Sequence, residues 1–229
     1  MNGRLRNLGL VLAAVGLVFM AAGAFALYKT QEGYSSLQAF SAAQDVRLTY
    51  AEDGQLVDRG EPAGAQAILA LLTDDWGYPV VAADLNPNDP LVNTPTEYMY
   101  QMATIAYHTL NGTQTIVLTE DKEYKGEVFA AGEYEFAVAG RYWTDFDRQH
   151  PLEGQAREKA WTGTAHALIA NLGVGTLTAS TLQLGLGLAG LFAGVGFIAI
   201  LAGLGLVWAT RAETAKAPSK VAFPQPIPA

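Results

Sequence analysis

Cysteine is absent from this sequence. Without it no disulfide can cross-link the fold, no thiolate can serve as a nucleophile, and sulfur cannot hold a zinc or iron–sulfur centre. Charge is also scarce, because 16% of the 229 residues are Asp, Glu, Lys or Arg, against about 25% in an average soluble domain. Folded parts must therefore be stabilised by packing, and part of the chain is expected to lie outside water.

Two apolar runs account for the low content of charged residues. Residues 8–27 hold no ionisable or strongly polar side chain, and residues 182–209 hold one amide, Gln183, at their edge. Twenty helical residues rise about 30 Å, the thickness of the hydrocarbon core of a bilayer. The sequence therefore predicts transmembrane helices over 8–28 and 182–209, with the lipid bilayer as a partner. Because ionisable groups inside a membrane mark ion and proton pathways, their absence argues against a transporter or pump.

The first apolar run has a second interpretation. Arg4 and Arg6 precede it, and Ala24-Phe25-Ala26 near its end fits the small-residue pattern of a signal-peptide cleavage site. A secretory signal usually has a shorter apolar run, of about 7–15 residues. We therefore favour a retained anchor, and cleavage stays open as the alternative.

The distribution of charge predicts the orientation. The two tails, residues 1–7 and 210–229, hold five basic residues and one acid, a balance of +4, so with a total of −8 the region between the runs carries −12. Basic residues collect on cytoplasmic flanks. We expect a multi-pass protein of the cell (plasma) membrane, with both termini cytoplasmic and residues 29–181 extracytoplasmic. Such an acidic domain does not suit nucleic acid, whose phosphates require Lys and Arg.

Residues 29–181 read as one α+β domain between the two transmembrane α-helices, with short strands or hairpins packed with about three helices. The helices are expected to begin at Pro62, just after Thr94, and at Pro151, because proline suits a first helical turn. Thr94 and Glu97 can also form a capping box, in which each side chain accepts a backbone N–H of the other residue. Residues 210–229 form a Pro-rich cytoplasmic tail, and its part from Ala217 on is expected to lack regular structure.

Alternating apolar residues predict short strands, with turns at 52–54 and 131–133 that would join neighbouring strands as hairpins. The helix from Pro151 is expected to end at 173–175, just before the second apolar run. The expected strands cover residues 46–50, 55–58, 114–118, 127–130 and 134–138.

Small residues recur at intervals of four in both apolar runs. Such spacing lets helix backbones approach closely in lipid, where packing drives association. It predicts contacts with each other, with a second copy or with other membrane subunits. The residues are Gly9, Ala13, Gly190, Gly194, Ala199 and Gly203.

The best candidate for a metal site is Asp147 with His150, since carboxylate and imidazole are common ligands and the spacing of three could place them on one helical face. The competing interpretation is that these residues form the lead-in to the helix at Pro151. No cofactor is expected.

Aromatic residues around a Pro-rich loop, and a second group later in the chain, predict an interaction surface, because Tyr and Trp are favoured at interfaces. The alternative is that they form an aromatic core with acids at its surface. The residues are Trp76, Tyr78, Tyr98, Tyr100, Tyr142 and Trp143.

Together these features favour a non-catalytic accessory or scaffold subunit of a larger bacterial membrane complex, such as a respiratory or oxygenase complex. It would contribute two packing helices and an outer-face interaction domain. The first alternative is an outer-face sensor or ligand-binding module whose partner carries the signal. The second is a membrane-anchored, metal-dependent enzyme that uses Asp147 and His150 together with His108.

Overall fold

A computed structural model describes residues 2–215 and divides the chain into two compact units. The first unit joins the residues up to Gly33 with those from Leu182 on, and the second unit is Tyr34–Thr181. The two longest helices, α1 (Asn2–Gln44) and α5 (Gly163–Ala215), contribute to both units. From residue 216 on, the predicted Pro-rich tail lies outside the described residues.

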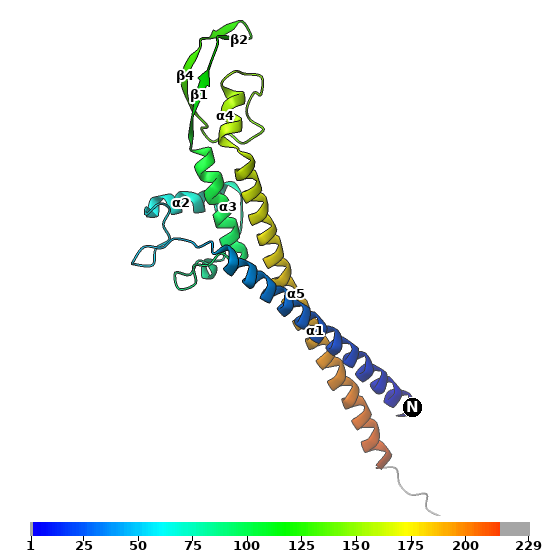
Figure 1. Ribbon diagram of the computed structural model, residues 1–229. Coiled ribbons are helices and arrows are strands. Elements are labelled where there is room, and N and C mark those ends of the chain that lie inside the picture. Colours follow the sequence, from blue (N-terminus) through cyan, green and yellow to red (C-terminus); the bar gives the residue numbers. More distant parts are fainter. Residues whose placement is uncertain (1, 216–229) are drawn as a thin grey trace, which may run out of the picture. The chain divides into compact units, whose positions relative to one another are not determined.

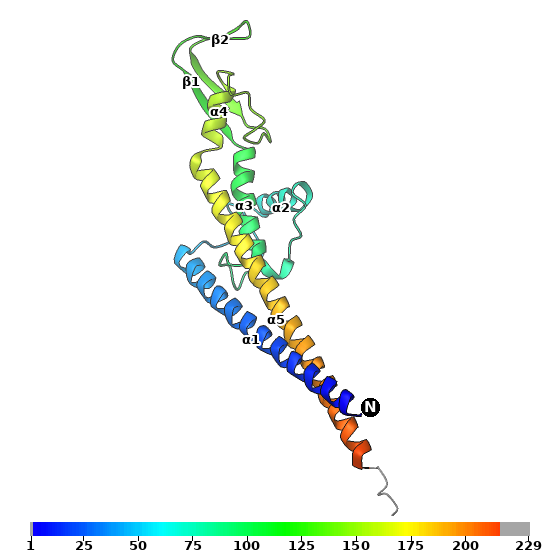
Figure 2. The ribbon, with the colours of Figure 1, turned by 90° about the vertical axis from the view of Figure 1, so that its right-hand side faces the viewer.

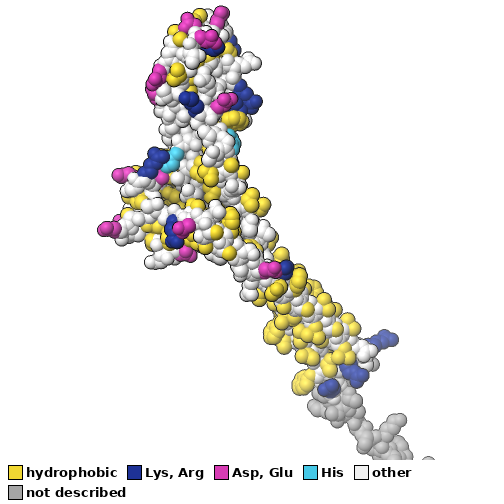
Figure 3. Space-filling model, in the orientation of Figure 1, with side chains coloured by type: hydrophobic (Ala, Val, Ile, Leu, Met, Phe, Trp, Pro, Cys, Tyr) yellow, Lys and Arg dark blue, Asp and Glu magenta, His cyan; other side chains and the backbone are white. Residues whose placement is uncertain are grey.

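The first unit consists of the N-terminal part of α1 and the C-terminal part of α5, which run side by side (Figures 1 and 2). Both helices are long and apolar enough to cross a membrane. In their most apolar 18-residue windows only 11% and 17% of the residues are buried, whereas the core helix of a soluble protein would be mostly buried. Figure 3 shows hydrophobic side chains covering these helices on the face in view, while acidic side chains gather on the second unit.

The second unit is built around α3 (Pro95–Leu110). The predicted capping box is confirmed: Thr94 Oγ1 accepts from the Glu97 N–H at 3.3 Å, and Glu97 Oε2 accepts from the Thr94 N–H at 2.9 Å. The predicted helix at Pro62 is also present as α2 (Pro62–Ala70), which continues into the π-helical turn η1 (Leu71–Asp75). A short 3₁₀ turn, η2 (Ala82–Asp84), precedes α3.

Two small antiparallel sheets complete the mixed α and β structure of the second unit. β1 (Thr113–Leu118) pairs with β4 (Gly132–Ala137), and β2 (Lys122–Tyr124) pairs with β3 (Glu127–Phe129). In β1, Ile116 and Leu118 are buried, because alternate side chains of a strand share one face.

The hairpin predicted across residues 131–133 is wrong. The strand before this turn, β3, pairs with β2, and the strand after it, β4, pairs with β1. β2 has the sequence Lys-Glu-Tyr and no buried residue, so it carries none of the apolar alternation by which a strand is recognised. Pairing between strands is decided by tertiary packing, which the local turn signal did not report.

The earlier hairpin is present only in part. Gly54 takes a positive φ of 83° and donates its N–H to Ala51 O at 2.9 Å, as the predicted turn requires. The flanking segments, however, make only an isolated bridge between Tyr50 and Leu56 instead of two strands.

The helix predicted from Pro151 to 173–175 is also wrong in its extent. A short helix, α4 (Glu153–Ala160), ends just before Trp161, and α5 then runs without interruption through Gly173 and Gly175. Thr162 begins the new helix, because its Oγ1 accepts the Ala165 N–H at 3.1 Å. The glycine at 175 has a packing role: a Cβ there would lie 2.6 Å from the ring of Tyr98, so α3 can approach α5 closely only at a glycine.

Candidate functional site: a seam of small residues between two apolar helices

The contact between α1 and α5 in the first unit is made backbone to backbone. A Cβ added at Gly9 would lie 2.6 Å from Gly203 O, and one at Gly16 would lie 2.6 Å from Gly196 O. A Cβ at Gly23 would lie 2.9 Å from Ala189 O. Real Cβ atoms essentially never approach other atoms this closely, so these glycines are what allows the two antiparallel helices to touch.

The seam repeats every seven residues on both helices. A seven-residue repeat keeps one stripe of each helix against its partner in a left-handed pair. All eight residues are buried, although the helices around them are mostly exposed. We call this set the seam: Gly9, Gly16, Gly23 and Thr30 on α1, and Ala189, Gly196, Gly203 and Thr210 on α5.

The predicted packing residues divide between two faces of the helix pair. Gly9 and Gly203 belong to the seam, and Ala13 touches it, with its Cβ 3.0 Å from a Cβ built at Gly203. Gly190 and Gly194 have open space where a Cβ would be, so they point away from α1.

Ala199, the remaining predicted position, is half-buried. Sequence reasoning looked for a four-residue spacing and missed most of the seam. The seven-residue recurrence of small residues from Gly9 and from Ala189 was the signal that would have found it.

Three of the predicted aromatic residues, Trp76 from the first group and Tyr142 and Trp143 from the second, form one cluster with Trp161 and His166 in the second unit. Trp76 Nε1 donates to Tyr142 Oη at 2.9 Å, and the Tyr142 ring stacks on Trp161 with centroids 5.7 Å apart. His166 contacts both Trp161 and Trp143 edge-on or tilted, at 5.9 and 5.0 Å. This aromatic cluster of five residues joins η1, α4 and the start of α5, and Tyr142 is its most exposed predicted member, at 38%.

Tyr98 and Tyr100 do not belong to an exposed interaction surface, which corrects the prediction for these two residues. They are 6% and 3% exposed. Both lie on the buried face of α3, so the alternative interpretation, an aromatic core, applies to them. Tyr78 and Trp143 are half-buried.

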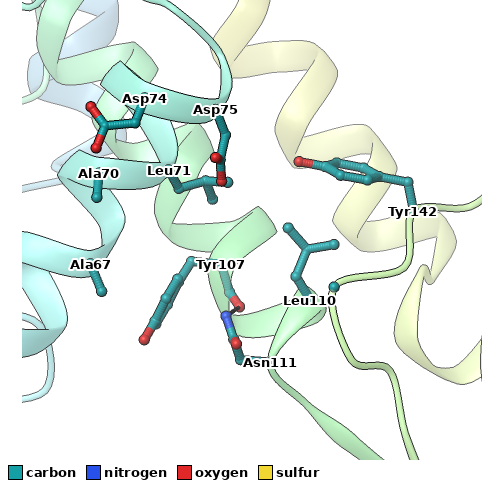
Figure 4. A pocket seen from close by; sticks show the side chains of 10 residues that line it. Ala67, Ala70, Leu71, Asp74, Asp75, Tyr107, Leu110, Asn111 and Tyr142 are labelled. Atoms are coloured by element: carbon teal, nitrogen blue, oxygen red, sulfur yellow. Dashed lines mark hydrogen bonds between the residues drawn. The ribbon is translucent and has the colours of Figure 1, made fainter.

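A cavity of about 370 Å³ lies beside the aromatic cluster. Residues of α2 and η1 line one side of it and Tyr142 another (Figure 4). The carboxylates of Asp74 and Asp75 make its wall acidic. The full lining is Ala67, Ala70, Leu71, Asp74, Asp75, Tyr107, Leu110, Asn111, Gly140 and Tyr142.

Asp147 and His150, the predicted metal ligands, are engaged with the protein. Asp147 Oδ2 accepts from the hydroxyl of Tyr124 and from Lys125 Nζ at 3.2 Å. His150 Nδ1 accepts the N–H of Glu153 at 3.3 Å, at the start of α4. Within residues 2–215 no group of three or more potential His, Asp or Glu ligands comes together. The lead-in to a helix, which was the competing interpretation, describes this arrangement.

The contacts of Asp147 predict a pH dependence of stability. The hydrogen bond from Tyr124, followed by those from Gln149 and Lys125, lowers the pKa of Asp147 to about 2. Since this pKa lies below the value of about 3.9 for an unfolded Asp, the stabilisation is fully present above pH 4 and is lost as the pH falls through 2. In thermal unfolding between pH 5 and pH 2, Asp147→Asn should lose less stability than the unsubstituted chain. Glu133→Gln, which changes an exposed carboxyl on β4, is the control; equal slopes in all three proteins would contradict the assignment.

His108 and Asp58 form a second polar pair, with His108 Nε2 3.0 Å from Asp58 Oδ1. The buried hydroxyls of Tyr50 and Tyr100 have no hydrogen-bond partner among the described residues. Burial raises the pKa of both tyrosines. The hydrogen bond between His108 and Asp58 joins α3 to the turn that precedes α2. Because the pKa of Tyr50 and of Tyr100 is raised, both tyrosines stay neutral.

The fold and the seam define a class: a chain with a mixed α and β unit and two apolar helices, long enough to cross a membrane, that close on each other through glycine and alanine. Comparison with protein-family models, with curated proteins and with solved structures gives no match.

Proposed function

We propose that this chain is a two-pass protein of the cell membrane that acts as a non-catalytic accessory or scaffold subunit of a larger membrane complex. In this proposal α1 and α5 cross the bilayer as a preformed pair. Both termini lie in the cytoplasm, and the second unit lies on the outer side as an interaction domain.

The proposal rests on a face of α5 that is rich in glycine and lies opposite the seam. Gly187, Gly190 and Gly194 have open space at the Cβ position, and α1 covers the opposite face through the seam. Glycine in a helix interior costs about 1 kcal/mol relative to alanine. At these three positions that cost is not explained by packing against α1, because nothing lies within 4 Å of a Cβ built there. A close backbone contact with another apolar helix is the use that small residues have in lipid. We therefore assign this face to a transmembrane helix of another subunit.

The orientation can be tested with single cysteines, because the chain has none of its own. We expect Asn88→Cys, in an exposed loop of the second unit, to react with a membrane-impermeant maleimide in intact cells. Gly3→Cys, at the N-terminal end of α1, should react only after the membrane is opened. Labelling of both positions in intact cells would contradict the proposed topology.

The subunit role predicts stoichiometric partners. A tagged chain purified in mild detergent from its native membrane should retain at least one other membrane protein. The double variant Gly190→Leu/Gly194→Leu should lose that protein, because two leucine side chains would fill the face that the partner helix contacts. Gly3→Leu, another glycine with open space around it, is the matched control and should retain the partner.

Two results would overturn the subunit role. One is a preparation that contains this chain alone, whatever its oligomeric size. The other is an unchanged set of partners in the double variant. To show that the α1–α5 pair itself is intact, each variant should also carry Phe19→Cys and Phe192→Cys, whose parent rings lie 5.9 Å apart, and should be tested with a short thiol cross-linker.

A further inference from the structure

A second cavity, of about 250 Å³, lies within the second unit where the C-terminal end of α1, α3 and the first turns of α5 meet. Its wall is mostly aliphatic or aromatic, and Phe40, Val46 and Leu168 remain 58%, 37% and 46% exposed beside it. The remaining lining residues are Ser41, Gln44, Val92, Tyr98, Gln101, Ile105, Asn171 and Leu172.

Among the residues that the structure describes, no Asp, Glu, Lys, Arg or His lines this cavity. Two other cavities of the same unit differ in this respect: the one in Figure 4 contains Asp74 and Asp75, and the one next to Asp58 contains Arg47 and Arg59. An ion brought into an uncharged apolar site would lose hydration without gaining a counter-charge. The lining therefore selects an uncharged ligand.

The cavity also contains a hydrogen-bond donor that the protein does not use. Ser41 Oγ and Tyr98 Oη lie 2.8 Å apart, and both residues are more than nine-tenths buried. Two hydroxyls carry two hydrogens, and the single bond between them uses one. The second hydrogen has no acceptor among the described residues.

The side-chain amides of Gln44, Gln101 and Asn171 add further polar groups to the wall. A mostly apolar cavity with a few convergent polar groups is the usual form of a small-molecule site.

We propose that this cavity binds a neutral molecule with an aliphatic body and one hydrogen-bond-acceptor oxygen, such as a medium-chain alcohol or the uncharged end of a lipid. The aliphatic part lies against Ile105, Leu168 and Leu172. The oxygen accepts the free hydrogen of the Ser41–Tyr98 pair. This gives the second unit a ligand-binding role that the subunit proposal does not require.

The test uses the full chain in lipid nanodiscs and three photoreactive diazirine probes of equal chain length: an octanol, an octanoate and an octylammonium. The octanol probe should label the cavity residues of α1, α3 and α5 in peptide mass spectra, and excess unlabelled octanol should abolish the labelling. The two charged probes should label the same peptides at least tenfold less.

Two pairs of variants separate the cavity from the surrounding lipid. Leu172→Trp fills the cavity and should remove saturable labelling, whereas Val174→Trp, at a 63% exposed position of the same helix, should leave it unchanged. The double variant Ser41→Ala/Tyr98→Phe removes both hydroxyls and should weaken octanol binding about fivefold, the usual worth of one neutral hydrogen bond. Tyr107→Phe, on the same helix as Tyr98, should not.

Labelling that does not saturate, that is equal for charged and neutral probes, or that survives Leu172→Trp would overturn the proposal. If Leu172→Trp fails to fold, the probe-charge comparison and Ser41→Ala/Tyr98→Phe still decide it. A free alcohol and a bilayer lipid are distinguished by repeating the octanol titration with nanodisc lipids that themselves carry the diazirine. Loss of the subunit partners in Gly190→Leu/Gly194→Leu would leave every one of these results unchanged.

Discussion

Replacing Gly16 by leucine is expected to prevent α1 and α5 from closing on each other. A Cβ at this position would lie 2.6 Å from Gly196 O and 2.8 Å from Ile200 N. These are backbone atoms of a helix, so no side-chain rotation can relieve the contact. Overpacking a core usually costs about 1–3 kcal/mol and occasionally more. Gly16→Leu should lie at or above the upper end of that range.

The cross-linking yield between Phe19→Cys and Phe192→Cys measures this closure directly, and thermal unfolding in detergent measures its cost. Gly16→Ala should also lower the cross-linking yield and the stability, because its Cβ already meets the backbone of α5. The loss should be smaller than for Gly16→Leu, because alanine adds no further carbons. Gly3→Leu, with open space around it, is the control and should resemble the unsubstituted chain. If Gly16→Leu cross-links as well as Gly3→Leu does, the seam is not the contact that holds the pair.

Removing the carboxylate of Glu97 is expected to destabilise the second unit strongly. Glu97 is 1% exposed, and its Oε2 accepts the N–H groups of Asn93 at 3.0 Å and Thr94 at 2.9 Å. In Glu97→Ala both donors lose their acceptor, and a buried unsatisfied donor costs about 1–3 kcal/mol. We expect a loss of about 2–5 kcal/mol, or roughly 10 °C in melting temperature for a domain of this size.

Three further variants are compared with Glu97→Ala by their loss of stability. Glu97→Gln keeps one side-chain oxygen as an acceptor and should cost less than Glu97→Ala. Thr94→Ala removes the other half of the capping box and should cost about 1 kcal/mol. Glu127→Ala, at an exposed position of β3, should change the melting temperature little. A melting temperature in Glu97→Ala equal to that of Glu127→Ala would show that the buried carboxylate is dispensable.

Glu97 also contributes a pH dependence of opposite sign to that of Asp147. Burial raises the pKa of Glu97, although the N–H groups that it accepts partly offset this. Between the ordinary pKa of a glutamate and this raised value, the folded state holds a proton that the unfolded state has lost. Stability therefore falls as the pH rises through that interval, and Glu97→Gln should remove the fall.

Sequence alone was sufficient wherever the deciding interaction is local or depends only on the solvent. The apolar runs predicted two helices long enough to cross a membrane, because each run holds at least 20 residues with almost no polar side chain. Thr94, Pro95 and Glu97 predicted the start of α3, since the capping box is closed within four residues. The turn at Gly54 was predicted for the same reason.

Tertiary structure alone decided which residues meet. Local signals could not pair β4 with β1, because the partners are separated by a second small sheet. They could not show that Tyr98 and Tyr100 are buried, since α3 is covered by elements distant in sequence. Nor could they distinguish Gly9 and Gly203, which form the seam, from Gly190 and Gly194, which face away from it. A glycine carries the same local signal on every side of a helix, and only the approach of a second backbone assigns its role.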